Sequence, residues 1–320
     1  MAGLSPSGGS GTSSETRDGD RAQIILVTAF ALAVAFVALS VVINGAIFTQ
    51  NLATRGDTAG GGDALQQRQQ AEQMVGDLLE QENTDGSPAA QDLEEAIREL
   101  SNASGYQQSV AGRAVDYTGV STSDGTRVFQ DSPGNFTNTT GASNWTVAES
   151  VGDTRRFDIV VTDTGELEDP GDDPFAVTLT DPSSGDTWRM VLSEDSDITL
   201  TTTYVDGPDS FTRSCTASDS LTDVTINVTE GSFAGEPCEA LQFARNVSGG
   251  TGGLGTYDVH FNNTENVEGT YSLTVNTTVG TDDAPNDKSI LYSATVEYTY
   301  RTANLVYETD IRVAPGEPDD

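Results

Sequence analysis

The sequence predicts a mainly β fold, in which an N-terminal transmembrane helix and a short helical stalk precede an antiparallel β-sandwich, either one large sandwich or two stacked ones. Three patterns lead to this prediction. One stretch near the N-terminus is apolar throughout, two later stretches place apolar residues at helical spacing, and the chain from about residue 114 alternates between apolar and polar residues. Their order gives the domain organisation.

The predicted regions follow one another in a simple order. They are a disordered tail or leader (1–21), a transmembrane helix (22–48), a linker with an amphipathic helical stalk (49–105), a β-sandwich region (106–315) and an acidic tail (316–320). The first region is rich in Gly, Ser and Thr, a composition that does not bury a core. Residues 205–210 could divide the sandwich region into two domains.

The transmembrane prediction depends on the twenty residues Ile24–Ile43, which carry no charge. A helix of that length spans about 30 Å, the thickness of the hydrocarbon core of a bilayer. Thirteen of the twenty are Ile, Leu, Val or Phe, so insertion is favoured by about 4–8 kcal/mol. A cleaved secretory signal has a shorter apolar core. The stretch therefore favours a membrane anchor.

Two amphipathic helices are expected after the anchor. Asp63 resembles an N-cap, and the apolar residues after it keep helical spacing up to Leu79. Ser87-Pro88 resembles the start of a second helix, whose apolar stripe includes Leu93 and Ile97. We expect a helical hairpin, or a stalk that packs on the β domain.

The β region shows a period of two. Apolar positions recur at alternate residues in the segments 175–179, 188–192, 224–228, 257–261, 271–275, 292–300 and 305–311. Turn-forming clusters such as Asp181-Pro182-Ser183-Ser184-Gly185 separate them. Many short strands with one polar face are typical of antiparallel sheets, most simply a sandwich.

The charge of the chain is strongly acidic. It has 50 acidic and 15 basic residues, a net charge of −35, and Lys288 is its only lysine. At molar salt the Debye length falls to about 3 Å, so self-repulsion is screened. The acids are spread along the chain, as in proteins of extreme halophiles. A nucleic-acid partner is not expected, because phosphate contacts need Lys and Arg.

Two cysteines, Cys215 and Cys238, make up the whole cysteine content. An even number in an exported chain favours one disulfide. Two buried free thiols are the alternative. A zinc site is not expected, because His260 is the only histidine and the cysteines lack metal-binding spacing.

Eight N-x-[ST] sequons all follow the apolar stretch, which favours a cytoplasmic N-terminus and an extracellular, N-glycosylated C-terminal region of a single-pass protein. They lie at Asn102, Asn135, Asn138, Asn144, Asn227, Asn246, Asn262 and Asn276. The last two and Asn227 fall on polar positions of predicted strands.

Several motifs resemble catalytic or ligand-binding sites, but their sequence context does not support such a role. Residues 250–255 fit G-x-G-x-x-G, but a strand follows instead of a helix, so we expect a flexible loop. His260 is expected on the solvent face of a strand, with no G-x-S-x-G elbow in the chain. The segment Asp163–Asp173 holds six carboxylates without the spacing of a calcium loop.

Two further features carry little information. Arg55-Gly56-Asp57 resembles an integrin-binding tripeptide. Trp145 and Trp188 are expected in the core. No residue is therefore assigned as catalytic, cofactor-binding or metal-binding.

Short motifs resemble one known family. Arg21-Ala22-Gln23-Ile24, directly before the apolar stretch, resembles an archaeal prepilin (class III) signal, which implies cleavage between Ala22 and Gln23. The segment from Asp20 to Asp57, the "GEPC" at Gly235–Cys238 and the C-terminal "YETDIRVAPGEPD" resemble a haloarchaeal family of pilin-like, single-span surface proteins. The resemblance implies an N-terminal helix that bundles in a filament core.

The expected function is that of a non-enzymatic, membrane-anchored cell-surface protein. The more specific expectation is a minor pilin-like component of a surface filament or of a secretion assembly. The expected partners are the lipid bilayer and pilin-like or secretion-assembly subunits. The alternative is a stand-alone adhesin or receptor ectodomain that binds a ligand. A more remote alternative is an exported enzyme.

Overall fold

The computed structural model describes residues 61–84, 87–241, 254–277 and 284–318. The predicted membrane span, the Ala22–Gln23 cleavage site, the tripeptide at 55–57 and Asn246 lie outside these residues. Within them, no helix is both long enough and apolar enough to cross a membrane. The chain divides into two compact units, Met1–Asp63 and Ala64–Asp320, and the fold below is that of the second unit.

Both expected helices are present. Helix α2 (Gly61–Thr84) buries Ala71, Val75 and Leu79, and helix α3 (Ala90–Ser109) buries Leu93 and Ile97. These are the apolar positions that helical spacing singled out.

The start of each helix differs from the prediction. Asp63 lies inside the first turn of α2, two residues after its start. The N-cap of α3 is Ala89 rather than Ser87, and no side chain of its own caps the helix. Instead, the carboxylate of Glu82 accepts a hydrogen bond from the backbone N–H of Ala89 at 3.0 Å. An acceptor from the preceding helix thus replaces the expected local cap.

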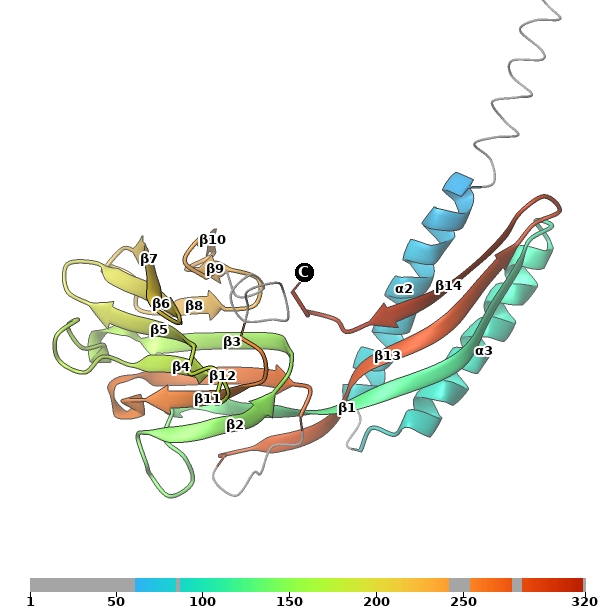
Figure 1. Cartoon of the computed structure of the whole chain (residues 1–320). Helices are drawn as coiled ribbons and strands as arrows, with labels where there is room; N and C mark the ends of the chain where they lie inside the picture. Colours follow the sequence, from blue (N-terminus) through green and yellow to red (C-terminus); the bar gives the residue numbers. More distant parts are fainter. Residues whose placement is uncertain (1–60, 85–86, 242–253, 278–283, 319–320) are drawn as a thin grey trace, which may run out of the picture. The chain divides into compact units, whose positions relative to one another are not determined.

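The described residues form a mainly β fold of antiparallel sheets, as predicted. One sheet has the order β10-β9-β8-β3-β12-β1-β13-β14 (Figure 1). Its strands are β1 (Ala114–Asn135), β3 (Thr154–Asp163), β8 (Val224–Asn227), β9 (Ser232–Phe233), β10 (Glu236–Pro237), β12 (Glu268–Val275), β13 (Asp287–Arg301) and β14 (Val306–Val313).

The second sheet has the order β2-β11-β4-β5-β6-β7. Its strands are β2 (Trp145–Val151), β4 (Ala176–Thr180), β5 (Thr187–Glu194), β6 (Ile198–Asp206), β7 (Asp209–Ala217) and β11 (Tyr257–Asn262). Short 3-10 helices follow β3 (Thr164–Glu166) and β11 (Thr264–Asn266). The segment 205–210, proposed as a domain break, is the turn of the β6–β7 hairpin, because the two strands pair directly on either side of it.

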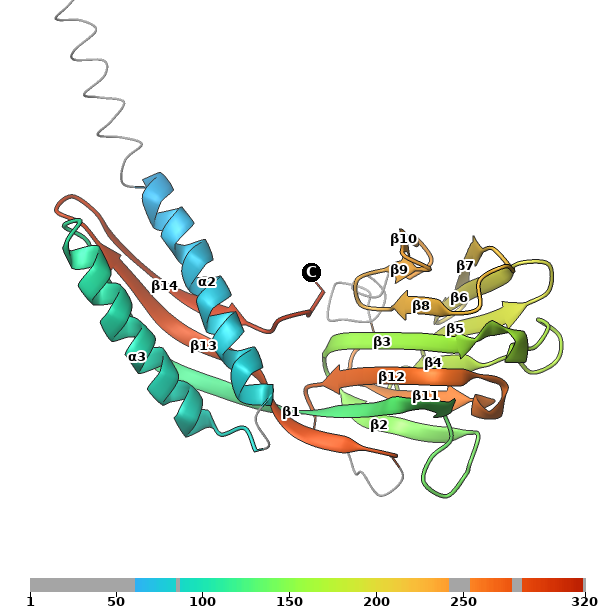
Figure 2. The same ribbon diagram turned by 180° about the vertical axis from the view of Figure 1, so that it is seen from behind.

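Two hydrophobic cores fill the unit. The larger lies between the two sheets and contains both tryptophans, Trp145 and Trp188. The smaller lies where α2 and α3 cover β14 and the adjoining parts of β1 and β13 (Figures 1 and 2). The predicted β-sandwich is therefore a single one, and the expected stalk packs its apolar faces on an extension of one of its sheets.

The predicted disulfide is confirmed. Cys215 on β7 is bonded to Cys238, with the two Cα atoms 6.0 Å apart. The bond ties β7, the edge strand of the six-stranded sheet, to the segment that follows β10.

Removal of this bond should destabilise the domain. For a cross-link with a sequence separation of 23 residues, the chain-entropy model gives about 3.5 kcal/mol. We expect reductant to lower the denaturant midpoint of the wild type, measured by circular dichroism in concentrated salt. A Cys215→Ser, Cys238→Ser double variant is the control, because it should start at the lower midpoint and not respond to reductant. An unchanged wild-type midpoint after complete reduction would contradict this expectation.

Both cores contain buried tyrosines. Tyr257 and Tyr271 lie in the larger core, and Tyr298 lies in the smaller one. Burial raises the pKa of each phenol well above its usual value, as it does for Tyr292. A nearby carboxylate, Glu317, accepts the hydrogen bond of the Tyr292 hydroxyl at 3.0 Å and raises that pKa further.

These raised pKa values predict alkaline unfolding. Below a pH of about 10 the phenols are protonated in both the folded and the unfolded chain; above it only the unfolded chain ionises, so stability falls by about 1.4 kcal/mol per pH unit for each buried tyrosine. We expect tyrosinate absorbance to appear together with loss of near-ultraviolet circular dichroism. A Tyr298→Phe variant should show a shallower fall. Gradual tyrosinate formation in a fully folded chain would refute the assignment.

Candidate functional site

A cationic pocket of about 450 Å³ lies where the end of α2 meets the eight-stranded sheet. We use this name for the hollow lined by Glu80, Asn83, Thr84, Arg127, Arg155, Arg156, Asp158, Ser272, Thr274, Lys288 and Ile290. Four of the fifteen basic residues of the chain, including its only lysine, line it beside two carboxylates. In a chain with a net charge of −35, that local excess of positive charge sets the pocket apart.

Strand register places the cations in one row. Arg156 on β3 pairs with Thr274 on β12, Thr274 pairs with Arg127 on β1, and Arg127 pairs with Lys288 on β13. Directly opposed residues on antiparallel strands have Cβ atoms about 5 Å apart, and like charges in that position repel. The sheet therefore sets two cations, Arg127 and Lys288, against each other on the wall of the pocket.

Each of the two exposed arginines in the row, Arg127 and Arg156, contacts neighbouring side chains. Arg156 Nε donates to Asp158 at 2.7 Å. Arg127 Nε donates to Ser272 Oγ at 2.8 Å, and its guanidinium lies 4.7 Å from the centre of the Phe129 ring. These contacts hold the guanidinium groups in place while more than two fifths of each side chain remains exposed.

Lys288 and Asn83 fix the end of α2. Lys288 Nζ donates to the carbonyl of Asn83 at 2.5 Å and lies 3.4 Å from that of Thr84. A cation at this position satisfies the terminal carbonyls and is attracted by the negative end of the helix dipole. The Asn83 side chain both donates to the carbonyl of Leu291 and accepts from its N–H, each at 2.8 Å. The helix end is thereby attached to β13.

Arg155 is buried where α2, the eight-stranded sheet and the C-terminal segment meet. Its side chain is 5% exposed and pairs with Glu80 of α2. Its nitrogens donate to the carbonyls of Pro315 at 2.6 Å, Tyr292 at 2.9 Å and Leu291 at 3.4 Å. Burial lowers the pKa of Arg155 to about 10, so the guanidinium remains charged at neutral pH.

Loss of Arg155 should weaken the unit markedly. Arg155→Met leaves the carbonyls of Pro315 and Tyr292 and the Glu80 carboxylate without this donor, so we expect the free energy of unfolding to fall by about 2–4 kcal/mol. Arg156→Met is the matched control; its side chain is 61% exposed, and the expected loss is below about 1 kcal/mol. Denaturant unfolding of both variants measures the difference. Equal losses would show that Arg155 does not hold these segments together.

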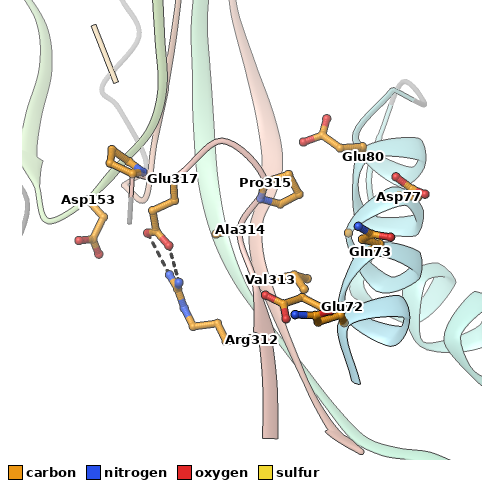
Figure 3. A pocket seen from close by; sticks show the side chains of 13 residues that line it. Glu72, Gln73, Asp77, Glu80, Asp153, Arg312, Val313, Ala314, Pro315 and Glu317 are labelled. Carbon is orange, nitrogen blue, oxygen red and sulfur yellow. Dashed lines mark hydrogen bonds and ion pairs between the residues drawn. The ribbon is translucent and has the colours of Figure 1, made fainter. Parts of the chain in front are cut away.

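An acidic groove of about 1150 Å³ lies beside α2, facing the C-terminal segment (Figure 3). Its carboxylates are Glu72, Asp77, Glu80, Asp153 and Glu317. The last of these is bound by two nitrogens of Arg312, one of them at 3.1 Å. Part of the predicted acidic tail thus packs against the domain. In the part of the chain that the structure describes, no three His, Cys, Asp or Glu residues are grouped to hold a metal ion.

The candidate catalytic and metal residues do not come together. His260 is half-buried on β11, and its Nδ1 lies 3.0 Å from the hydroxyl of Thr146 on the neighbouring strand. The carboxylates of 163–173 form no metal-binding group in the described residues. Residues 250–253 of the glycine-rich motif lie outside the described residues, and β11 follows soon after them.

The sequons differ in how the fold uses them, and glycosylation stays a prediction. Asn102, Asn135 and Asn144 are exposed, whereas Asn227, Asn262 and Asn276 are half-buried. The remaining described one, Asn138, is 8% exposed, and its oxygen accepts from the N–H groups of Thr140 and Ala142.

Asn276 lies one residue beyond the end of β12, not within the strand as expected. Its side chain bridges to the turn before β3. The amide oxygen accepts from the N–H groups of Gly152 and Asp153, and the amide nitrogen donates to the Asp153 carboxylate at 2.9 Å. That nitrogen is the atom to which an N-glycan would be attached.

Sequence reasoning missed the cationic pocket. The scarcity of basic residues is a usable signal, since any cluster of them stands out in this chain. Their row, however, depends on the pairing of β3, β12, β1 and β13, which are far apart in the sequence.

Comparisons with other proteins add no assignment: the chain matches no protein-family model, no curated protein and no solved structure.

Proposed function

We propose that this chain is a non-enzymatic, single-pass cell-surface protein of a halophilic archaeon, with a cytoplasmic N-terminus and an extracellular C-terminal domain. The observation that carries the proposal is the uncharged stretch Ile24–Ile43, followed by a separate folded β domain. A stretch of that length and composition partitions into a bilayer. The domain begins well after its end.

Two features of the domain support export. The Cys215–Cys238 disulfide is of a kind that persists in oxidising compartments outside the cytoplasm. The acidic surface suits concentrated salt, which screens a net charge of −35. The prepilin-like signal at 21–24 supports the more specific proposal that the chain is a minor pilin-like component of a surface filament or secretion assembly, with pilin-like subunits as partners.

Mass spectrometry of the mature N-terminus tests these proposals. We expect a membrane-fraction protein whose first residue is Gln23, because prepilin processing removes residues 1–22 and leaves the apolar stretch in place. An intact or acetylated N-terminus in the membrane fraction would support a plain anchor and contradict the pilin-like role.

Protease added to intact cells tests the topology. We expect digestion of the domain from outside, with a cytoplasmic protein as the protected control. A chain that is recovered in the soluble fraction without detergent, or is protected from the protease, would contradict membrane anchoring with an external domain.

A receptor or adhesin domain is the second candidate, and the cationic pocket favours it. The opposed cations Arg127 and Lys288 repel each other, and a bound anion would relieve that repulsion. Carboxylate and phosphate groups suit arginine, whose planar guanidinium can donate two parallel hydrogen bonds. The ligand class proposed for this alternative is therefore a small polyanion.

Calorimetric titration with citrate tests the second candidate. We expect the Arg127→Gln, Arg156→Gln double variant to bind citrate at least about tenfold more weakly than the wild type, because each lost charge-assisted bond contributes about 1.5–3 kcal/mol. Arg301→Gln is the matched control, since Arg301 is an exposed arginine of β13 outside the pocket. Equal affinity of wild type and double variant would remove the pocket as a binding site.

A further inference from the structure

An apolar tip is formed where the chain enters the folded domain. Six large hydrophobic residues are exposed among the described residues, and four of them belong to this tip. They are Leu65, 57% exposed, Tyr106, 77%, Val110, 84%, and Val306, 60%. These four residues make up the apolar tip.

Contacts between segments bring the four together. Gln108 near the end of α3 donates to Gln67 near the start of α2 at 3.1 Å. Ala114 at the start of β1 pairs with Arg301, which pairs with Val306 across the β13–β14 hairpin. Figures 1 and 2 show the start of α2, the end of α3 and this hairpin turn at the same end.

The tip lacks the acidity of the rest of the chain. Residues 64–71, 100–115 and 300–307 contain three arginines and no Asp or Glu, although about one residue in six of the whole chain is acidic. Two of the arginines pair with acids just beyond these segments, Arg68 with Glu72 and Arg301 with Glu308. Asp63, in the first turn of α2, is thus one of few carboxylates beside the tip.

We propose that the apolar tip lies against the outer face of the bilayer, with Tyr106 and Val110 in the headgroup region. This inference rests on the proposed membrane anchor. The bilayer is proposed as the contact because the predicted membrane span lies close by in the sequence. The span ends at Ile43, and α2 begins at Gly61. Exposed Tyr beside aliphatic residues and arginines is the composition of protein segments at the membrane interface.

Because residues 44–60 connect the tip to the predicted membrane span, even a weak affinity of the tip for lipid would keep it at the bilayer. The seventeen intervening residues reach at most about 60 Å when fully extended, so the tip is never far from the lipid. Short tethers give effective concentrations of the order of millimolar. Among the described residues, Phe211 and Leu221 are the other large apolar side chains that are exposed, so the tip is the part of the domain best suited to contact lipid.

Fluorescence quenching by labelled lipid tests the inference. The full chain carrying Val110→Cys is coupled to an environment-sensitive fluorophore and reconstituted into vesicles that contain a lipid spin-labelled near its headgroup; the native cysteines are protected in their disulfide. Ser183→Cys, on an exposed turn of the sandwich, is the matched control. We expect about twofold or stronger quenching at 110 and almost none at 183, because quenching acts only over the short distances of the interface. Tyr106→Asp with Val306→Asp should abolish the difference.

The outcomes separate the two proposals. A chain that does not float with the vesicles overturns the anchor and the inference with it. A chain that floats but shows equal quenching at both positions overturns only the inference. Fluorescence changes at 110 that follow protein density in vesicles without quencher would place a second copy on the tip and overturn the bilayer contact.

Discussion

The described fold depends on the long strand β1, which contributes to both hydrophobic cores, and on β13, which pairs along it and contributes to the smaller core. Their pairing runs from Ala114–Arg301 to Val128–Asp287, with register shifts between Thr118 and Ser121 and between Ser123 and Asp124. Gly125 lies on this shared stretch, and a Cβ there would come within 2.4 Å of the Val275 carbonyl and 2.9 Å of Tyr292. Only a residue without a side chain lets the neighbouring strands approach so closely. The sandwich and the helical layer are therefore continuous through one pair of strands.

Polar contacts around the end of α2 complete this connection. Arg155 and Lys288 both bind backbone carbonyls, and Asn83 pairs with the backbone of β13 as a neighbouring strand would. Lys288 binds carbonyls of the last residues of α2, Arg155 pairs with Glu80 of that helix, and Asn83 pairs with Leu291, so these three side chains hold the end of α2 against the sheet. In an acidic chain with few cations, two of them are used at one junction. The cationic pocket is consequently both a structural joint and the best candidate for anion binding.

Much of the architecture could be predicted from local pattern alone. Burial of Trp188, Met190 and Leu192 follows the period of two, and burial of Val75 and Leu79 follows the period of helices. The cap of α3 could not be predicted, because Glu82 reaches it from another helix. The row of Arg156, Thr274, Arg127 and Lys288 could not be predicted either, because the register between distant strands is set by packing and not by local sequence. The same holds for the single sandwich, which depends on the pairing of β1 with both β12 and β13.

The hydrogen bonds of Asn276 have a consequence for the order of events after synthesis. A sugar on its amide nitrogen would replace one of the two N–H hydrogens there and would compete for space with the bond from that nitrogen to Asp153, and Asn138 is enclosed by its own turn. An oligosaccharide would therefore be attached more readily at these two positions before the surrounding strands close. Their occupancy in the mature protein, compared with that of the open Asn102, is thus a record of whether modification or folding came first.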